Sequence, residues 1–317
     1  MVMIYSDMEK NGLGLLSKGR ELADAKGAKL TALVTGPEGK TTAEKYIKYG
    51  ADKVIVAAAD MANPKAEEIA DILENAIKQE NPSMVLISST KYGKELAPRL
   101  AAKMDAGSAS EVNKIELEGD NVVVERVVYS GNAVSREMFT SAPAIMTVPP
   151  KTFDPLEEDA SRSGEIVESD ASPSEHPSKI LDVQAMKSEG ANVEDAEIIV
   201  SCGRGFKSSD DLKLIENLAG TLNGVTLGCS RPIAADLKWL SEDHWIGLSG
   251  HKVKPKLYVA CGISGQIQHV AGMRDSGIIV AINKDPDAPI FNSADYGIVG
   301  DLYKVLPKLI DAINAKK

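Results

Sequence analysis

The first half of the chain alternates short apolar runs with longer stretches in which apolar residues recur at helical spacing. Four runs are too short for helices and predict buried strands at residues 2–5, 30–34, 54–58 and 84–88. Helical spacing follows each run and predicts helices over residues 13–26, 43–49, 65–78 and 93–104. Strands and helices that alternate in this way predict a parallel sheet covered on both faces.

Between residues 111 and 148 the helical spacing gives way to short strand-like segments separated by turns. Their β-branched residues predict strands at residues 111–117, 122–129, 138–140 and 144–148. We expect these strands to be antiparallel and to join the same sheet at its edge. Residues 150–178 are acidic and rich in Pro and Ser, which is typical of a linker or a loosely held crossover. A further short strand is predicted at residues 180–183.

The second half of the chain returns to alternating strands and helices. Apolar runs predict strands at residues 198–201, 225–228, 257–260, 277–282 and 294–301. Helices are expected over residues 209–222, 232–240 and 302–315, and another begins near residue 267. The predicted fold is therefore α/β with two domains. Residues 1–190 form a parallel sheet with antiparallel edge strands, and residues 191–317 form a doubly wound domain.

Composition narrows the class of protein. The hydrophobic content of 43% and charged content of 26% are ordinary for a globular protein, and the net charge of −10 argues against a nucleic-acid partner. Much of this charge lies in residues 151–176, which hold eight carboxylates. No apolar run approaches the ~20 residues of a membrane helix, and no signal or transit segment precedes the first strand. We expect no membrane insertion and a cytoplasmic location.

The cysteines and histidines do not follow the spacing of a metal site. Cys202, Cys229 and Cys261 contain no CxxC pair, follow or lie within apolar runs, and are expected to be buried free thiols. The four histidines are scattered, with neither HExxH nor a Cys/His cluster, so we expect no bound metal. A serine hydrolase is also disfavoured, because the sequence contains no GxSxG motif.

Candidate chemistry gathers at the predicted carboxyl ends of the C-terminal strands, where open α/β sheets bind ligands. The strand at 257–260 runs into Gly262-Ile263-Ser264-Gly265, whose glycines allow a ligand to approach and whose serine offers a hydroxyl. Arg204 and Arg231 each follow another strand directly. The pattern favours an anion or nucleotide site. Taken singly, the turn also fits an ordinary βα connection, and each arginine fits a solvated surface charge.

The N-terminal domain offers weaker signals. It has neither GxGxxG nor a loop with the full GxxxxGK[ST] spacing of a P-loop. Ser88, Ser89 and Thr90 follow a predicted strand and could face a phosphate, although hydroxyls in such positions usually cap the next helix.

Several motifs of the C-terminal half, taken in order, resemble the FAD-binding domain of electron transfer flavoprotein alpha subunits. The resemblance covers residues 198–310 and is carried by GISG, IQH and AGM within 262–273, AINKDP and APIF within 281–291, and ADYGIVGD at 294–301. CGRG at 202–205 and SR at 230–231 resemble the family's GGRG and SR, with Cys202 at the first glycine. GLSG at 247–250 stands where the family often has GQTG, so Leu248 lacks a side-chain amide.

The resemblance implies FAD as the cofactor and gives each motif a role. Ser264, Gly265 and Gln268 resemble the residues that hold the pyrophosphate in the family. Asn283 and Asp301 resemble its ribose and adenosine contacts, and Arg204 resembles a residue near the phosphate. The residues that resemble the family's surroundings of the isoalloxazine ring are Ser230, Arg231, Gly247, Ser249 and His269. The full set of expected FAD contacts is Arg204, Ser230, Arg231, Gly247, Leu248, Ser249, Gly250, Gly262, Ile263, Ser264, Gly265, Gln268, His269, Asn283, Asp301 and Leu302.

The function that the resemblance implies is electron transfer without a substrate of the protein's own. Such an alpha subunit forms a heterodimer with a beta subunit, accepts electrons from acyl-CoA or other flavin dehydrogenases, as in fatty acid β-oxidation, and delivers them to a quinone oxidoreductase or another acceptor. One alternative is the FAD-binding subunit of an electron-bifurcating, NADH-dependent flavoprotein. A stand-alone NAD- or FAD-dependent enzyme and a nucleotide-sensing module without redox chemistry also remain open.

Overall fold

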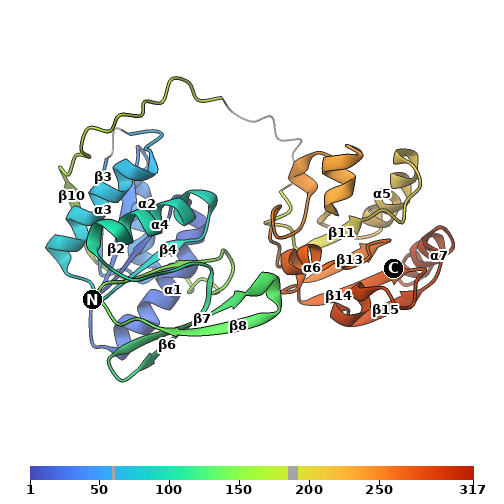
Figure 1. Ribbon diagram of the computed structural model, residues 1–317, viewed down its shortest axis with the longest axis horizontal. Helices are drawn as coiled ribbons and strands as arrows, with labels where there is room; N and C mark the ends of the chain where they lie inside the picture. Colours follow the sequence, from blue (N-terminus) through green and yellow to red (C-terminus); the bar gives the residue numbers. More distant parts are fainter. Residues whose placement is uncertain (59–60, 185–191) are drawn as a thin grey trace. The chain divides into compact units, whose positions relative to one another are not determined.

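The computed structural model describes residues 1–58, 61–184 and 192–317. The chain divides into two compact units, Met1–Asp182 and Val183–Lys317 (Figure 1). The predicted boundary between residues 190 and 191 lies outside the described residues. Among the described helices, none combines the length and the apolarity that a membrane crossing requires.

The first unit is built on a parallel sheet in the order β10-β3-β2-β1-β4-β9-β5. Its strands are β1 (Val2–Tyr5), β2 (Leu30–Thr35), β3 (Lys53–Ala57), β4 (Met84–Ser88), β5 (Ser108–Ala109), β9 (Ala144–Val148) and β10 (Glu165–Ser169). Helices α1 (Glu9–Ala25) and α2 (Gly39–Lys48) pack on one face, and α3 (Ala66–Glu80) and α4 (Lys91–Met104) pack on the other (Figure 1). The predicted parallel sheet with two covered faces is confirmed.

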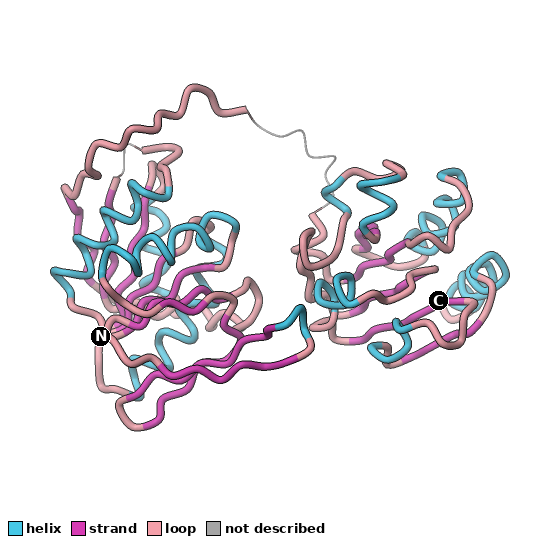
Figure 2. The backbone as a smooth tube through the Cα atoms, in the orientation of Figure 1, coloured by secondary structure: helices cyan, strands magenta, loops and turns pink. Residues whose placement is uncertain are grey.

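The predicted antiparallel strands form a sheet of their own. Strands β6 (Val112–Glu118), β7 (Asn121–Val128) and β8 (Ala133–Met138) make a three-stranded antiparallel sheet, which Figure 2 shows as a long hairpin with one added strand. The expectation that they extend the parallel sheet was wrong. Strand β9 instead enters the main sheet parallel to β4, because all five of its residues are buried, as in a central parallel strand.

The predicted acidic linker contains a strand that the sequence pattern did not predict. Strand β10 pairs in parallel with β3, and Arg162 before it reaches Asp52 Oδ1 at 2.9 Å. Arg20 holds the other oxygen of Asp52 at 2.6 Å, so two guanidinium groups share one carboxylate. By contrast, the strand predicted at 180–183 is absent. Its apolar residues Ile180 and Leu181 are 50% and 95% exposed, because none of the described strands pairs with this segment.

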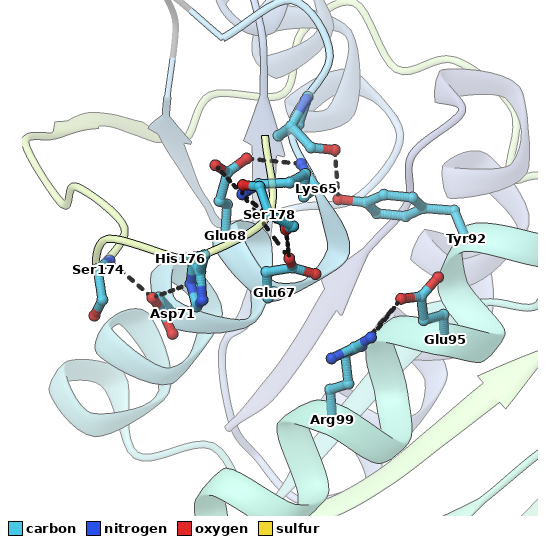
Figure 3. A network of polar contacts seen from close by, with 11 residues as sticks. Lys65, Glu67, Glu68, Asp71, Tyr92, Glu95, Arg99, Ser174, His176 and Ser178 are labelled. Carbon is cyan, nitrogen blue, oxygen red and sulfur yellow. Dashed lines mark hydrogen bonds and ion pairs between the residues drawn. The ribbon is translucent and has the colours of Figure 1, made fainter. Parts of the chain in front are cut away.

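The segment that follows β10 is fastened to α3 by a polar cluster, which we call the α3 latch: Asp71, Lys103, Ser174 and His176. Figure 3 labels Asp71, Ser174 and His176. Asp71 Oδ2 accepts from the Ser174 amide at 2.8 Å and lies 3.0 Å from His176 Nε2, while Lys103 Nζ pairs with Oδ1 at 2.9 Å. Burial alone would raise the pKa of Asp71, but Lys103 and the amide of Ser174 outweigh it and lower the pKa to about 2.

We expect Asp71→Asn to release the segment around Ser174. The change removes the charge that Lys103 and the Ser174 amide recognise, and charge-assisted hydrogen bonds contribute about 1.5–3 kcal/mol each. Hydrogen exchange at the Ser174 amide should accelerate at least about tenfold. Because the folded-state pKa of Asp71 lies below its ordinary 3.8, the latch should hold fully above that pH and weaken as the pH falls towards 2.

The neighbouring pair Glu95–Arg99 provides the control for this prediction. Its side chains are 52% and 49% exposed on α4, 2.8 Å apart, in the same view (Figure 3). An exposed pair one helical turn apart contributes only about 0.3–0.5 kcal/mol, so Glu95→Gln should leave the exchange of Ser174 unchanged. Equal exchange rates in both variants would show that Asp71 does not fasten the segment.

The second unit is a five-stranded parallel sheet in the order β12-β11-β13-β14-β15. Its elements are β11 (Ile198–Cys202), α5 (Lys213–Gly220), β12 (Val225–Cys229), β13 (Leu257–Cys261), α6 (Ile267–Met273), β14 (Ile278–Asn283), β15 (Tyr296–Val299) and α7 (Leu302–Asn314). Residues of α5 and α7 pack on one face and residues of α6 on the other (Figure 1). The two-domain α/β class is thus confirmed.

Two details of the second unit differ from the sequence expectation. The helix predicted over 232–240 is a single π-helical turn, Pro232–Asp236, because the chain turns at Lys238, whose φ is 54°. The first part of the predicted helix 209–222 is a 3₁₀ turn, Ser209–Leu212, that leads into α5.

The three cysteines end three neighbouring strands. Cys202 on β11 is in register with Cys229 on β12 and Cys261 on β13, and all three are buried free thiols, as predicted. Burial raises the pKa of the Cys202 thiol to about 12 and raises the pKa of the other two as well. These thiols therefore stay protonated and act as small apolar side chains beneath the carboxyl edge of the sheet.

Candidate functional site

The order of the second sheet fixes where a ligand would bind. The chain leaves β11 towards β12 and leaves β13 towards β14, on the other side, so the switch point lies between the carboxyl ends of β11 and β13. Ligands of doubly wound sheets bind at this point. The loops that begin there are Gly203–Gly205 and Gly262–Gly265, the two glycine turns that the sequence singled out.

The two turns are locked against each other through backbone atoms. The Gly205 amide donates to the Gly262 carbonyl at 2.9 Å, and the Gly203 amide donates to the Cys261 carbonyl at 3.0 Å. A Cβ atom on Gly203 would lie 2.5 Å from the Gly262 oxygen, and one on Gly205 would lie 2.6 Å from the Gly262 Cα. Only glycine fits at these positions. Arg204, between them, is exposed at the edge of the sheet.

The turn Gly262–Gly265 is supported by hydrogen bonds from β14 and from the segment that follows it. Asn283 Nδ2 donates to the Ile263 carbonyl at 2.9 Å, and the Ile290 amide donates to the Ser264 carbonyl at 3.0 Å. Gly265 has a φ of 84°, and a Cβ atom there would lie 2.2 Å from the Ile290 nitrogen. The side chains of Ser264 and Gln268 remain exposed at the same edge.

The structure therefore gives Asn283 a supporting role that the sequence did not suggest. Its amide nitrogen bonds to Ile263, and its Oδ1 accepts from the Asp285 amide at 3.0 Å. Asp301, the other expected adenosine-end residue, caps α7, where Oδ1 accepts from the Tyr303 amide at 3.0 Å. Leu302 next to it is buried against both turns, with Cδ2 2.9 Å from a Cβ built on Gly262. Helix α7 thus begins beside the locked turns.

The loop Trp245–Gly250, which we call the ring loop, lies between β12 and β13 in the chain and is hydrogen-bonded to the end of β12 and to α6. The Ile246 amide donates to the Cys229 carbonyl at 2.9 Å, and the Leu248 amide donates to the Gln268 carbonyl at 2.7 Å. The Arg231 guanidinium lies over the Trp245 ring at 5.9 Å from its centroid. Ser230 is buried, with its amide bonded to the Cys202 carbonyl at 2.9 Å. These bonds join the ends of β11 and β12 to the ring loop and α6.

The other residues of the ring loop differ in how far they are exposed to solvent. Gly247 is buried against α6. A Cβ atom on Gly272 of that helix would lie 2.5 Å from the Gly247 nitrogen. Leu248 is 40% exposed and Ser249 is exposed, so their side chains are accessible at the same edge. Gly250 closes the loop under Trp245, because a Cβ atom there would lie 2.5 Å from the Trp245 carbonyl oxygen.

His269 is a buried ionisable group beside the ring loop. It is 7% exposed, its Nε2 lies 3.0 Å from the Tyr258 hydroxyl, and its Nδ1 is buried without a hydrogen-bond partner in the part of the chain that is described. Burial lowers the pKa of His269 to about 4, and the Ile246 backbone beside the ring opposes this only in part. The imidazole is therefore neutral at neutral pH.

The sixteen expected contact residues fall into two connected groups. Arg204, Asn283, Asp301, Leu302 and residues 262–265 surround the locked turns. Ser230, Arg231, Gln268, His269 and residues 247–250 surround the ring loop. Sequence reasoning missed Tyr258, which holds His269, and Ile290, which supports Gly265. Tyr258 lies within an apolar strand run, and Ile290, although part of the APIF motif, carries no polar group, so neither was expected to shape the site.

The first unit has a switch point of its own, between β1 and β4, and it is filled with side chains. Asp7 accepts from Ser88 Oγ and from Thr90 Oγ1, both at 2.9 Å. Thr90 also caps α4 by accepting from the Gly93 amide at 3.0 Å. A carboxylate at this position repels a phosphate. The capping interpretation of Ser88–Thr90 is therefore the one that the structure supports.

Comparison with known proteins covers both units. The electron transfer flavoprotein domain matches residues 5–174, and the electron transfer flavoprotein FAD-binding domain matches residues 192–274. The electron transfer flavoprotein subunit alpha of Thermoanaerobacterium thermosaccharolyticum is 38% identical over 308 residues, covering 96% of this chain and 93% of that protein. That of Bacillus subtilis is 40% identical over 88% of this chain and 86% of its own. Protein FixB of Clostridium saccharobutylicum is 37% identical over 96% and 92%.

Proposed function

The chain belongs to the electron transfer flavoprotein alpha-subunit family, and from that premise we propose that its second unit binds FAD and passes electrons between partner proteins. Alpha subunits of this family pair with a beta subunit. The observation that chiefly supports FAD binding is the pair of glycine turns at the switch point, which are locked by the bond from Gly205 to Gly262.

The residues at this edge suit a flavin dinucleotide. The locked turns expose backbone and no apolar side chains, so a pyrophosphate can approach closely, with the hydroxyl of Ser264 and the amide of Gln268 beside it. Arg204 adds a positive charge at the same edge. The Nδ1 of His269 is buried without a partner among the described residues and needs a polar one, because an unsatisfied buried group costs about 1–3 kcal/mol. A flavin ring carbonyl beside the ring loop is such a partner.

Bound FAD supplies the one-electron chemistry, and the chain tunes it. A reduced flavin is anionic, so positive charge and hydrogen-bond donors near the ring raise its potential. Arg231 supplies the charge. Trp245 fixes the guanidinium over the ring loop, and His269 borders the same loop through Ile246. The two groups expected to hold the electron-rich ring positions therefore border one loop. Asn283 and Asp301 keep the turns and α7 in place for the adenosine end.

The proposed partners follow from this role. Electrons arrive from flavin dehydrogenases, acyl-CoA dehydrogenases among them, and leave to a quinone oxidoreductase or another acceptor, in the cytoplasm. A second candidate is the FAD-binding subunit of an electron-bifurcating, NADH-dependent flavoprotein. The 37% identity to a relative named Protein FixB is the observation that favours this second candidate. The two candidates differ in what the beta subunit holds, so cofactor counting separates them.

The test is to purify the full chain with its beta-type partner and to count FAD and adenine nucleotide per heterodimer. We expect one FAD and one AMP for an ordinary electron carrier and two FAD for the bifurcating type. A heterodimer without flavin, even after incubation with FAD, would contradict the proposal. An isolated chain that keeps FAD and turns over a substrate of its own would point to a stand-alone enzyme.

A further inference from the structure

Two buried side chains meet beside the ring loop, and their contact fixes the state of the imidazole. Tyr258 on β13 is fully buried, and its hydroxyl lies 3.0 Å from His269 Nε2. The two rings are tilted by 58°, with centroids 6.2 Å apart, so the hydroxyl meets the nitrogen at the edge of the imidazole. His269 Nδ1 is buried and has no partner among the described residues.

The number of buried polar groups left without a hydrogen bond shows which of the two groups donates. Burial raises the pKa of Tyr258, so its hydroxyl keeps its proton and must place it. If the hydroxyl donates to Nε2, one donor remains unsatisfied, the N–H on Nδ1. If Nε2 donates instead, the phenol proton and the lone pair on Nδ1 are both unsatisfied. Buried polar groups are almost always paired, so the first arrangement is favoured.

The surroundings of the pair agree with this arrangement. Ser201 Oγ is buried and makes no hydrogen bond with any of the described residues. Ser201 thus does not accept the phenol proton.

We propose that Tyr258 is a positioning residue that holds His269 as the neutral tautomer with its proton on Nδ1, so that the imidazole presents a donor to a carbonyl of the bound cofactor. The identity of that carbonyl as part of a flavin rests on the proposed function, whereas the tautomer does not. An imidazole without such a partner prefers its proton on Nε2. Loss of the Tyr258 hydroxyl should therefore turn Nδ1 into an acceptor, which repels a carbonyl.

The tautomer can be measured on the full chain without cofactor. Nitrogen NMR of ¹⁵N-histidine-labelled protein distinguishes a protonated from an unprotonated ring nitrogen, and His269→Gln identifies the signals among four histidines. We expect a protonated Nδ1 in the wild type and a proton moved to Nε2 in Tyr258→Phe. Tyr296→Phe, which changes a phenol 65% exposed on β15, should resemble the wild type. A wild type with its proton on Nε2 would overturn the proposal.

The consequence for binding is measured on the heterodimer with FAD. Tyr258→Phe keeps the shape of the side chain, and one misplaced hydrogen bond should weaken FAD binding about tenfold relative to Tyr296→Phe. Equal affinities in the two variants would overturn the positioning role. If the wild-type heterodimer binds no flavin, the proposed function fails, while the nitrogen signals still decide the tautomer. The two failures are therefore distinguishable.

Discussion

Gly265→Ala is expected to unfold the second unit at temperatures where the wild type is stable and to abolish FAD binding. The φ of 84° already disfavours any residue with a Cβ atom, and that atom would lie 2.2 Å from the backbone nitrogen of Ile290. Relief requires the Ile290 backbone to move, which breaks its bond to the Ser264 carbonyl. Strain and the lost bond together cost about 4 kcal/mol, which lowers the melting temperature of this unit by roughly 10–15 °C.

The control for this prediction is Gly220→Ala in the same unit. Gly220 ends α5, and nothing lies within 4 Å of its Cβ position. Because alanine favours helix, this change should leave the melting temperature equal or slightly higher, with FAD binding intact. Calorimetry that resolves the transition of the second unit, together with the FAD count per heterodimer, measures both variants. A Gly265→Ala protein that melts like Gly220→Ala would show that the turn is not rigidly held.

The parts of the fold that the sequence predicted are those in which a local pattern and burial agree. Strands β1 and β4 lie where apolar runs of four and five residues predict them, because these residues are buried on both faces of the sheet. Strand β10 was not predicted, because its composition resembles that of a linker. It lies at the edge of the sheet, where Glu165 and Glu168 are exposed. Its place depends on pairing with β3 and on Arg162, which no local pattern records.

The candidate site divides in the same way. Glycines and arginines at strand ends are visible in the sequence, because their chemistry depends on being next to a strand. The lock between Gly205 and Gly262 and the support that Asn283 gives to Ile263 join residues that are far apart in sequence. Only the strand order brings them together. The partnership of Tyr258 and His269 is similar, since a tyrosine within an apolar run predicts core and becomes a polar partner only once α6 packs on β13.

Arg231→Ala is expected to lower the one-electron potential of the bound flavin in the heterodimer. A unit charge 4 Å away contributes about 4 kcal/mol at an effective dielectric constant of ~20. Arg231 is exposed, so water screens it, and we take about half of that value. At 59 mV per factor of ten for one electron, the potential should fall by roughly 80 mV. Arg231→Lys keeps the charge but loses the planar contact with Trp245, so its potential should lie between the other two.

Two comparisons make this prediction specific to the ring. Arg204 lies on the locked turns and not on the ring loop, so Arg204→Ala should weaken FAD binding about tenfold and leave the potential nearly unchanged. Added salt should shrink the effect of Arg231→Ala, because the charge is exposed. Redox titration of the heterodimer against a reference dye, at low and high salt, measures both. A potential within about 15 mV of the wild type at low salt, well below the screened value, would mean that the guanidinium does not act on the flavin ring.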